Sequence, residues 1–318
     1  MVVDILLLVL GFILLIKGAD FFVDGASSIA QNLKIPKIII GLTIVAFGTS
    51  APELAVSIKA NLSGSSDIVI GNVVGSNIMN ILLILGISSI FSSMRVKDST
   101  VKKEIPFTIL FSTMLMVLAF DNMFDKNVTN MITRTDGIVI LLFFAIFIYY
   151  LVTVMKRDRN KEVDEKPKFN IFYSILFTII GLVGIVIGSN LVVDNAVEIA
   201  RILHISEKMI SLTIVAFGTS LPELVTSVQA ARKGENDIAI GNIIGSNIFN
   251  IGVVVGIPAA FIGSITVGNF NYLDMITMIV SAILLFILTF RKRKLDRTAG
   301  IVMLMIFAAY YTFVVIGG

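Results

Sequence analysis

The sequence predicts an all-α membrane protein of ten transmembrane helices in two inverted five-helix repeats. Three observations support this fold: an apolar composition, a series of long apolar segments and an internal repeat. Of the 318 residues, 56% are hydrophobic and 15% are charged, whereas roughly 25% are charged in an ordinary soluble domain. The mean hydropathy of +0.96 also indicates a chain that lies largely in lipid.

The positions of the expected spans follow from their length, because a hydrocarbon core about 30 Å thick needs about 20 mainly apolar residues per helix. The expected spans lie roughly at residues 3–25, 38–61, 68–92, 105–120, 136–155, 171–195, 207–231, 238–262, 272–290 and 299–317. The first segment has no basic residue before Lys17 and no small-residue cleavage signal. We therefore expect it to be a retained span and not a signal peptide.

The orientation follows from the basic residues between the spans. If both termini face outward, the inward loops hold 19 of the 25 Lys and Arg, the outward segments hold five, and Lys17 lies within the first span. The positive-inside rule then predicts that both termini are extracellular. Topology accounts for the basic residues, so no nucleic-acid partner is predicted. The absence of cysteine excludes disulfides and thiolate metal sites.

An internal repeat divides the chain. Residues 41–81 align without a gap to residues 211–251 at an offset of 170, and 26 of the 41 positions are identical. Each unit contains five expected spans, and five is odd, so the second unit crosses the membrane in the opposite sense. This predicts a first five-helix repeat at 1–155, a charged cytoplasmic linker at 156–170 and a second repeat at 171–318.

The most similar blocks place a carboxylate inside an apolar run, in LTIVAFGTSAPEL and LTIVAFGTSLPEL. Pro52 and Pro222 are expected to kink or unwind their helices and to free carbonyl groups that need partners within the bilayer. A carboxylate at mid-span costs about 3 kcal/mol or more. Inverted symmetry would bring Glu53 and Glu223 together, where they would repel each other. A bound divalent cation would neutralise both.

The next span of each half carries a polar stripe with a spacing of four residues. The stripe comprises Asn72, Ser76 and Asn80 in the first copy and Asn242, Ser246 and Asn250 in the second. Asn77 and Asn247 project in another direction and are interpreted as contacts between helices. Carboxylates, amides, carbonyls and hydroxyls are hard oxygen ligands suited to calcium, sodium or magnesium, and a flexible set of this kind favours calcium. Sodium has nearly the same ionic size.

The paired GTSxPEL and GNxxGSN blocks resemble the alpha-1 and alpha-2 repeats of the sodium/calcium exchanger superfamily, in particular its compact prokaryotic members. The resemblance covers essentially the whole chain. It implies a secondary active antiporter that exchanges sodium for calcium across the plasma membrane of a prokaryote by alternating access. It also implies that both ions are transported substrates, that no organic cofactor is needed and that the protein is a monomer or a weak homo-oligomer.

The resemblance further implies an ion cage in which Glu53 and Glu223 are the main calcium ligands. Its remaining members are Thr49, Ser50, Thr219 and Ser220 with the carbonyls of Ala46 and Ala216 at flanking sodium sites, and Ser76, Asn80, Ser246 and Asn250. The family's first and sixth spans are expected to slide across a rigid core. Here these are residues 3–25 and 171–195, and the small residues of the latter, Gly181, Gly184 and Gly188, fit a sliding contact.

One position departs from part of the family. Asn250 stands where potassium-dependent exchangers carry an acidic residue, so two carboxylates balance one calcium and transport is predicted to be independent of potassium. The main alternative is a proton/calcium antiporter, in which Glu53 and Glu223 would carry protons; the adjacent hydroxyl ligands favour sodium. A calcium channel fits poorly with two inverted halves. An enzyme is not predicted, because the carboxylates lack a nucleophile, a histidine base and a pocket for an organic substrate.

Overall fold

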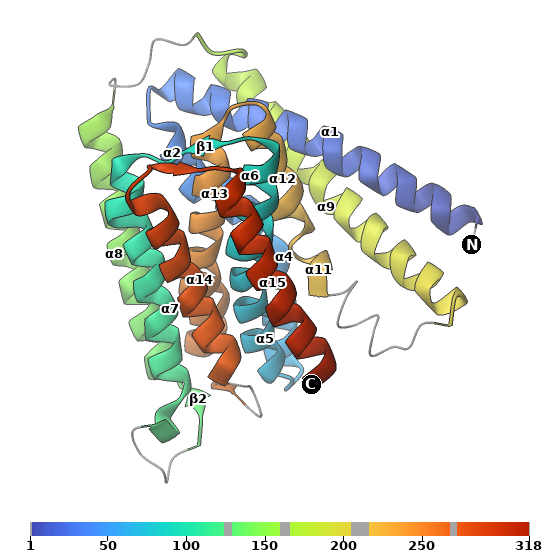
Figure 1. Cartoon of the computed structure of the whole chain (residues 1–318), viewed down its shortest axis with the longest axis vertical. Coiled ribbons are helices and arrows are strands. Elements are labelled where there is room, and N and C mark those ends of the chain that lie inside the picture. The colour runs from blue at the N-terminus through green and yellow to red at the C-terminus, as the bar shows by residue number, and fades with distance from the viewer. Residues whose placement is uncertain (1, 124–128, 160–165, 205–215, 268–271, 318) are drawn as a thin grey trace.

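The computed structural model describes residues 2–123, 129–159, 166–204, 216–267 and 272–317, and these residues form a bundle of helices (Figure 1). In the first half the elements are α1 (Val2–Leu33), α2 (Lys37–Ile40), η1 (Gly41–Val45), α3 (Ala46–Thr49), α4 (Ala51–Leu62), α5 (Asp67–Ile78), η2 (Met79–Leu85), α6 (Gly86–Phe91), β1 (Met94–Arg95), η3 (Thr100–Glu104), α7 (Ile105–Ala119), η4 (Asp121–Met123), β2 (Met131–Ile132) and α8 (Arg134–Asp158). The second half comprises α9 (Ile171–Ile202), α11 (Ala216–Gly218), α12 (Leu221–Arg232), α13 (Asn236–Phe249), η6 (Asn250–Val255), η7 (Pro258–Ile262), β3 (Ile265–Thr266), α14 (Tyr272–Phe290), β4 (Lys294–Leu295) and α15 (Arg297–Gly317). The all-α prediction is confirmed, because the strands are only two residues long.

Local sequence explains where the elements begin and end. Asn170 begins α9 by accepting a hydrogen bond from the Tyr173 N–H at 3.0 Å, as N-cap residues do. The turns after α4 and α12 contain Gly64 and Gly234, both at φ +78°. Glycine is favoured in this left-handed region, so the repeat, at its offset of 170, preserves the turn as well as the helices.

Several spans contain π-helical turns. These turns are η1, η2, η3, η6 and η7. A π-helical turn accommodates an extra residue and is frequent at functional sites. Asn80 lies in η2, and Asn250 is the first residue of η6. Both predicted asparagine ligands therefore lie in π-helical turns.

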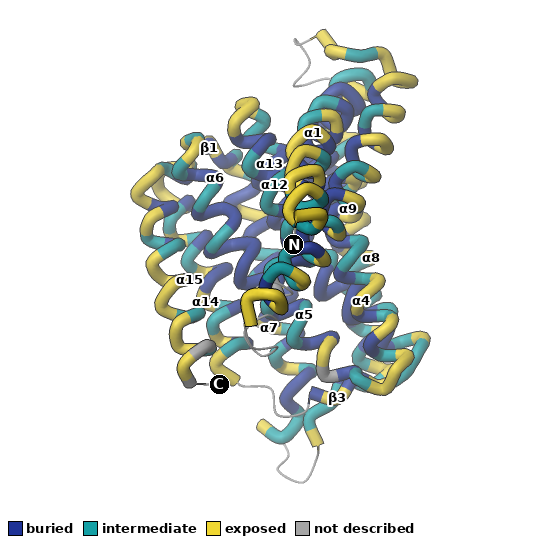
Figure 2. Tube along the Cα trace, turned by 90° about the vertical axis from the view of Figure 1, so that its right-hand side faces the viewer, coloured by how far each residue is buried: buried dark blue, intermediate teal, exposed yellow. Residues whose placement is uncertain are grey.

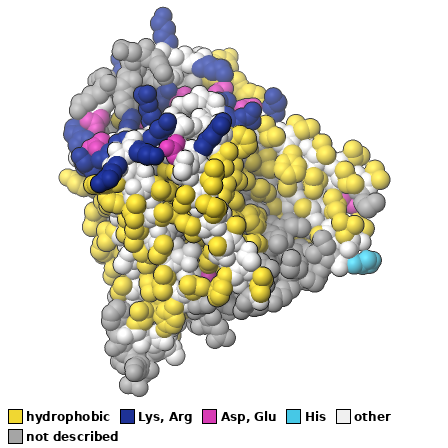
Figure 3. Space-filling view, viewed as in Figure 1, with side chains coloured by type: hydrophobic (Ala, Val, Ile, Leu, Met, Phe, Trp, Pro, Cys, Tyr) yellow, Lys and Arg dark blue, Asp and Glu magenta, His cyan; other side chains and the backbone are white. Residues whose placement is uncertain are grey.

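The surface is that of a membrane protein. Large apolar side chains are exposed on the outer faces of α1, α8, α9, α14 and α15, and the burial map shows the same outward faces (Figure 2). Lys and Arg side chains gather at one end of the bundle, above a surface covered by hydrophobic side chains (Figure 3). We call this the basic end; it carries β1, β4 and the turn between α12 and α13 (Figure 1).

The described residues contain seven helices long and apolar enough to cross a membrane, or eight if the bent pair Lys37–Thr49 and Ala51–Leu62 is counted as one span. The ten predicted spans therefore stay a prediction. At 105–120 the regular helix α7 has only 15 residues, because the π-helical η3 precedes it. The span expected at 207–231 lies partly outside the described residues.

Short strand pairs link the two halves at opposite ends of the bundle. β1 pairs antiparallel with β4, and β2 pairs antiparallel with β3 (Figure 1). Each pair contributes only two residues per strand, so the core that positions the site is helical. It centres on α5, η2, α13 and η6, most of whose apolar side chains are buried, with Ile68 near the start of α5 as an exposed exception.

Helices α1 and α9 lie side by side and are inclined to the rest of the bundle (Figure 1). A Cβ atom on Gly181 would lie 2.4 Å from the backbone nitrogen of Phe22, and one on Gly188 would lie 2.7 Å from that of Leu15. The prediction that Gly181, Gly184 and Gly188 contact the core was wrong, because they face α1 instead. Their spacing predicts a face of small residues but does not identify the helix that packs on it.

Candidate ion-binding site

The site is built around two helix breaks. Ser50 separates α3 from α4, and the segments Lys37–Thr49 and Ala51–Leu62 meet at an angle of 46°. Ser220 precedes α12 with φ −89° and ψ 1°, close to the values of −85° and 5° at Ser50. Pro52 and Pro222 lie at the second position of α4 and α12, where the missing N–H is tolerated. The expectation that the helices kink or unwind is confirmed by the bend at the first break and by the non-helical Thr219 and Ser220 at the second.

A carbonyl freed by proline finds a partner on α9. The carbonyl of Gly218, four residues before Pro222, accepts a hydrogen bond from the Ser189 hydroxyl at 3.1 Å. Sequence reasoning missed Ser189, because its position relative to Gly218 depends on how α9 packs. The contact shows how a backbone acceptor left by the break is satisfied within the bundle.

Glu53 and Glu223 lie in the first turns of α4 and α12, where the helix dipole favours negative charge. Each is only 1% exposed, and Ser50, the residue that precedes α4, contacts Glu223 of the other half. The Ser50 hydroxyl donates to Glu223 Oε1 at 3.0 Å, and the Ser246 hydroxyl lies 3.5 Å from the same oxygen. The structure thus brings both predicted carboxylates together.

The polar stripes of α5 and α13 form the facing walls. Thr49 Oγ1 lies 3.0 Å from Asn242 Oδ1 and 3.4 Å from Ser246 Oγ. The Ser220 hydroxyl lies 3.4 Å from Ser76 Oγ. Hydroxyl groups from the break of one half therefore meet the stripe of the other half, as the prediction of facing motifs requires.

Asparagine side chains join the two stripes crosswise. Asn77 Nδ2 donates to the Asn247 carbonyl at 3.2 Å, and Asn247 Nδ2 donates to the Asn77 carbonyl at 3.3 Å. Asn80 Nδ2 donates to Asn247 Oδ1 at 2.9 Å, and Asn250 Nδ2 donates to Asn77 Oδ1 at 3.0 Å. The interpretation of Asn77 and Asn247 as contacts between helices is confirmed. These bonds also fix the orientation of Asn80 and Asn250.

Five oxygen atoms at this site lack a hydrogen-bond donor among the residues that the structure describes. They are Glu53 Oε1 and Oε2, Glu223 Oε2, Asn80 Oδ1 and Asn250 Oδ1. Leaving a buried acceptor unsatisfied costs about 1–3 kcal/mol, and more for a charged group. A cation would satisfy all of these acceptors at once. All five are hard oxygens, which suit calcium and sodium.

The remaining predicted ligands flank this group. The Ala46 carbonyl accepts from the Ser50 N–H at 3.0 Å and from Thr49 Oγ1 at 3.3 Å, so it keeps its helical bond. Thr219 is half-buried after α11, and Ala216 begins that helix at the edge of the described segment. In the described part of the chain, no three His, Asp or Glu side chains come together as a metal cluster, so neutral oxygens must supplement the two carboxylates.

Sequence reasoning missed two supporting serines. Ser57 lies 3.2 Å from Asn72 Nδ2, and Ser227 lies 2.9 Å from Asn242 Nδ2; both accept from the amide. A signal for them exists in the sequence, because both serines are retained at the offset of 170 and each lies four residues after a buried glutamate, on the same helical face.

The family model described as "Sodium/calcium exchanger protein" matches residues 3–153 and 173–316. The chain belongs to this family. The chain is 38% identical to the "Putative antiporter CaxA" of Alkalimonas amylolytica, over 98% of both chains. It is also 34% identical to the "Sodium/calcium exchanger MaX1" of Methanosarcina acetivorans, over 97% of both chains.

Solved structures of an exchanger have the same fold. The sodium-calcium exchanger NCX_Mj soaked with 10 mM Na+ and zero Ca2+ has a TM-score of 0.82 and 35% identity, over 99% of both chains. The form soaked with 2.5 mM Na+ and 1 mM Sr2+ has a TM-score of 0.84 and 33% identity, over 98% of both chains. Because the chain belongs to this family, it is a multi-pass membrane transporter whose activity is cation/calcium antiport.

Proposed function

We propose that the protein exchanges sodium for calcium across the plasma membrane by alternating access, without a requirement for potassium. The observation that carries this proposal is the group of five buried oxygens around Glu53 and Glu223 that have no donor among the described residues. Calcium balances two carboxylates, and the neighbouring hydroxyls of Thr49, Ser50 and Ser220 offer neutral oxygens for sodium. The names of the exchangers MaX1 and NCX_Mj add support from proteins of similar sequence.

In this proposal the transport domain consists of ten spans in two inverted repeats, 1–155 and 171–318, joined by the linker 156–170. The basic end faces the cytoplasm by the positive-inside rule, and both termini lie outside. Helices α1 and α9 move together across the core, because their glycine contacts interlock them. The ligands are Glu53 and Glu223, with Thr49, Ser50, Thr219, Ser220, Ser76, Asn80, Ser246, Asn250 and the carbonyls of Ala46 and Ala216.

The testing experiment is calcium uptake into sodium-loaded vesicles diluted into sodium-free medium that contains radioactive calcium. We expect uptake that needs the sodium gradient, persists with a protonophore and is the same with and without potassium. Vesicles that contain the same sodium concentration on both sides are the control. Equal uptake driven by a pH gradient without sodium would instead support the second candidate, a proton/calcium antiporter in which the paired carboxylates carry the protons.

Asn250→Asp is expected to make calcium uptake sensitive to potassium. The substitution adds a third carboxylate to a site whose two carboxylates already balance calcium, so the remaining negative charge can hold a monovalent cation. We expect potassium to raise the apparent calcium affinity at least about fivefold, within the usual range of coupling between sites. The measurement is the calcium dependence of uptake in potassium and in choline, with the unsubstituted protein in parallel. No difference between the two media would contradict the role given to Asn250.

A further inference from the structure

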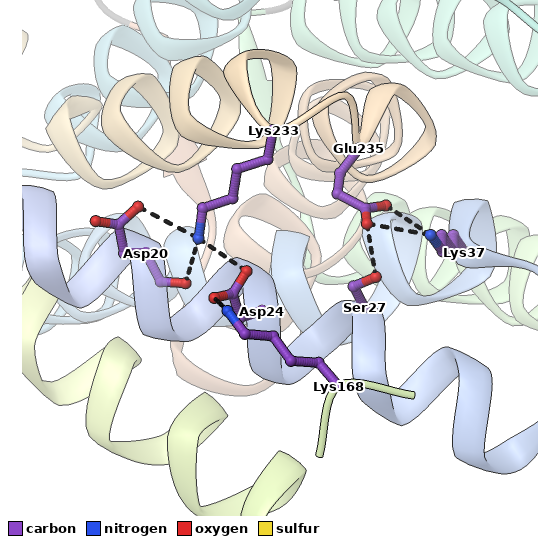
Figure 4. Close-up of polar contacts among 7 residues, drawn as sticks. All are labelled: Asp20, Asp24, Ser27, Lys37, Lys168, Lys233 and Glu235. Carbon is purple, nitrogen blue, oxygen red and sulfur yellow. Dashed lines mark hydrogen bonds and ion pairs between the residues drawn. The ribbon is translucent and has the colours of Figure 1, made fainter. Parts of the chain in front are cut away.

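Charged side chains connect α1 to the core at the basic end (Figure 4). Most of them line an open hollow of about 500 Å³. Lys233, in the turn between α12 and α13, directs its ammonium group toward α1. Its Nζ lies 2.8 Å from Asp24 Oδ1, 3.3 Å from Asp20 Oδ1 and 2.8 Å from the Asp20 backbone carbonyl. An ammonium group has three donors, and these three acceptors all belong to one helix.

Neighbouring contacts extend this attachment. Glu235 accepts from the Ser27 hydroxyl of α1 at 2.9 Å and pairs with Lys37 at 3.0 Å. Lys168, just before α9, lies 2.6 Å from Asp24 Oδ2. Asp24 therefore pairs with Lys233 from the core and with Lys168 from the segment that leads into α9 (Figure 4).

The ion pairs are partly shielded from water. The side chains of Lys233, Asp24 and Asp20 are 26%, 21% and 32% exposed, whereas those of the ion pair Arg201–Glu198 on α9 are 49% and 53% exposed. Screening by solvent and salt is weaker for partly buried pairs. Because α1 is interlocked with α9 through glycine contacts, holding α1 also holds α9.

The internal repeat does not reproduce this attachment at the other end of the bundle. At the offset of 170, the positions that correspond to Lys233, Glu235 and Asp20 are occupied by Ser63, Ser65 and Asn190. The turn between α4 and α5 has the same left-handed glycine as its counterpart but no lysine. Asp194 corresponds to Asp24 and is exposed. The backbone turn is thus repeated, whereas Lys233 and Asp20 have no charged counterparts in the repeat.

We propose that Lys233, Asp20 and Asp24 form a latch at the basic end that holds the α1–α9 pair against the core. Since the repeat places Ser63 and Asn190 where the latch has Lys233 and Asp20, the latch makes the free energies of opening the two ends unequal, although the repeats themselves are alike. The latch rests on the proposed function, because it requires that α1 and α9 are the helices that move during transport. Its residues lie outside the ion-binding site.

Lys233→Gln tests the latch, with Lys292→Gln as the matched control. Lys292 also lies at the basic end, and its ion pair with Asp296 at 3.3 Å joins two residues that flank β4 in the same segment. The chain has no cysteine, so Leu33→Cys and Arg291→Cys introduce two unique sites for spin labels. Distances between them are measured by double electron–electron resonance in lipid nanodiscs without sodium or calcium.

We expect Lys233→Gln to raise the population of a second, altered distance by roughly 2- to 10-fold, the range for losing one or two partly exposed ion pairs. Lys292→Gln should leave the distribution unchanged, and Lys233→Arg should restore it. Choline chloride at high concentration should raise the second population in the unsubstituted protein but not in Lys233→Gln. An unchanged distribution in Lys233→Gln, or the same change in Lys292→Gln, would overturn the latch.

The distance measurement is independent of transport. If sodium-dependent calcium uptake is absent, the proposed function fails, while the response of α1 to Lys233→Gln can still be read. If uptake is present and the distances do not respond, only the latch is rejected.

Discussion

Glu53→Gln and Glu223→Gln are each expected to reduce sodium-dependent calcium uptake by at least about 100-fold. Each substitution keeps the shape of the side chain but removes one of the two charges that balance calcium. Removing one partner from a buried charge pair costs about 3–5 kcal/mol, and each 1.4 kcal/mol corresponds to a factor of ten. Initial rates of uptake in reconstituted vesicles measure the effect.

Glu104→Gln provides the matched control for this prediction. Glu104 is also a buried glutamate, 2% exposed, but it lies in η3, where it accepts a hydrogen bond from the Tyr150 hydroxyl of α8, away from the two helix breaks. Its conversion to glutamine should leave uptake within about twofold of the unsubstituted rate. Near-normal uptake in either Glu53→Gln or Glu223→Gln would reject that residue as a principal calcium ligand.

Gly181→Ala is expected to lower both the thermal stability and the rate of uptake, because its Cβ atom would lie 2.4 Å from the Phe22 backbone nitrogen. That neighbour is main chain, so α1 and α9 must separate to accept a single methyl group. Overpacking of this kind typically costs about 1–3 kcal/mol. We expect a reduction in uptake of about tenfold and a lower midpoint of thermal unfolding in detergent.

Gly184→Ala on the same helix is the control. There the added Cβ would lie 3.3 Å from the Gly18 Cα atom and 3.6 Å from the Leu14 carbonyl oxygen, contacts that a small shift accommodates. Its stability and uptake should stay close to those of the unsubstituted protein. Equal effects of the two substitutions would show that the close approach of α1 and α9 is not what limits folding or transport.

Much of the site could be predicted from the sequence because its signals are local. Proline after a Gly-Thr-Ser triplet predicts a break wherever the helix lies, and a spacing of four residues puts Ser76 and Asn80 on one helical face. The repeat at an offset of 170 predicted that the two breaks would face each other. The contact of Ser50 with Glu223 agrees with this prediction.

Other features depended on packing between distant segments. The sequence predicted that Gly181 and its neighbours form a small-residue face, but only the structure placed that face against α1. The partners of Ser189 and Lys233 are likewise residues far away in the sequence.

The sequence by itself determined the membrane environment, the two helix breaks and the oxygen-bearing side chains of the candidate site, because composition, proline and helical periodicity act over a few residues. Only the tertiary structure decided which helix packs on the glycine face of α9, how the asparagines bond to one another across the two halves and which lysine pairs with Asp20 and Asp24. These features depend on which surfaces meet, and a helix pattern specifies the face that is buried but not the partner that buries it.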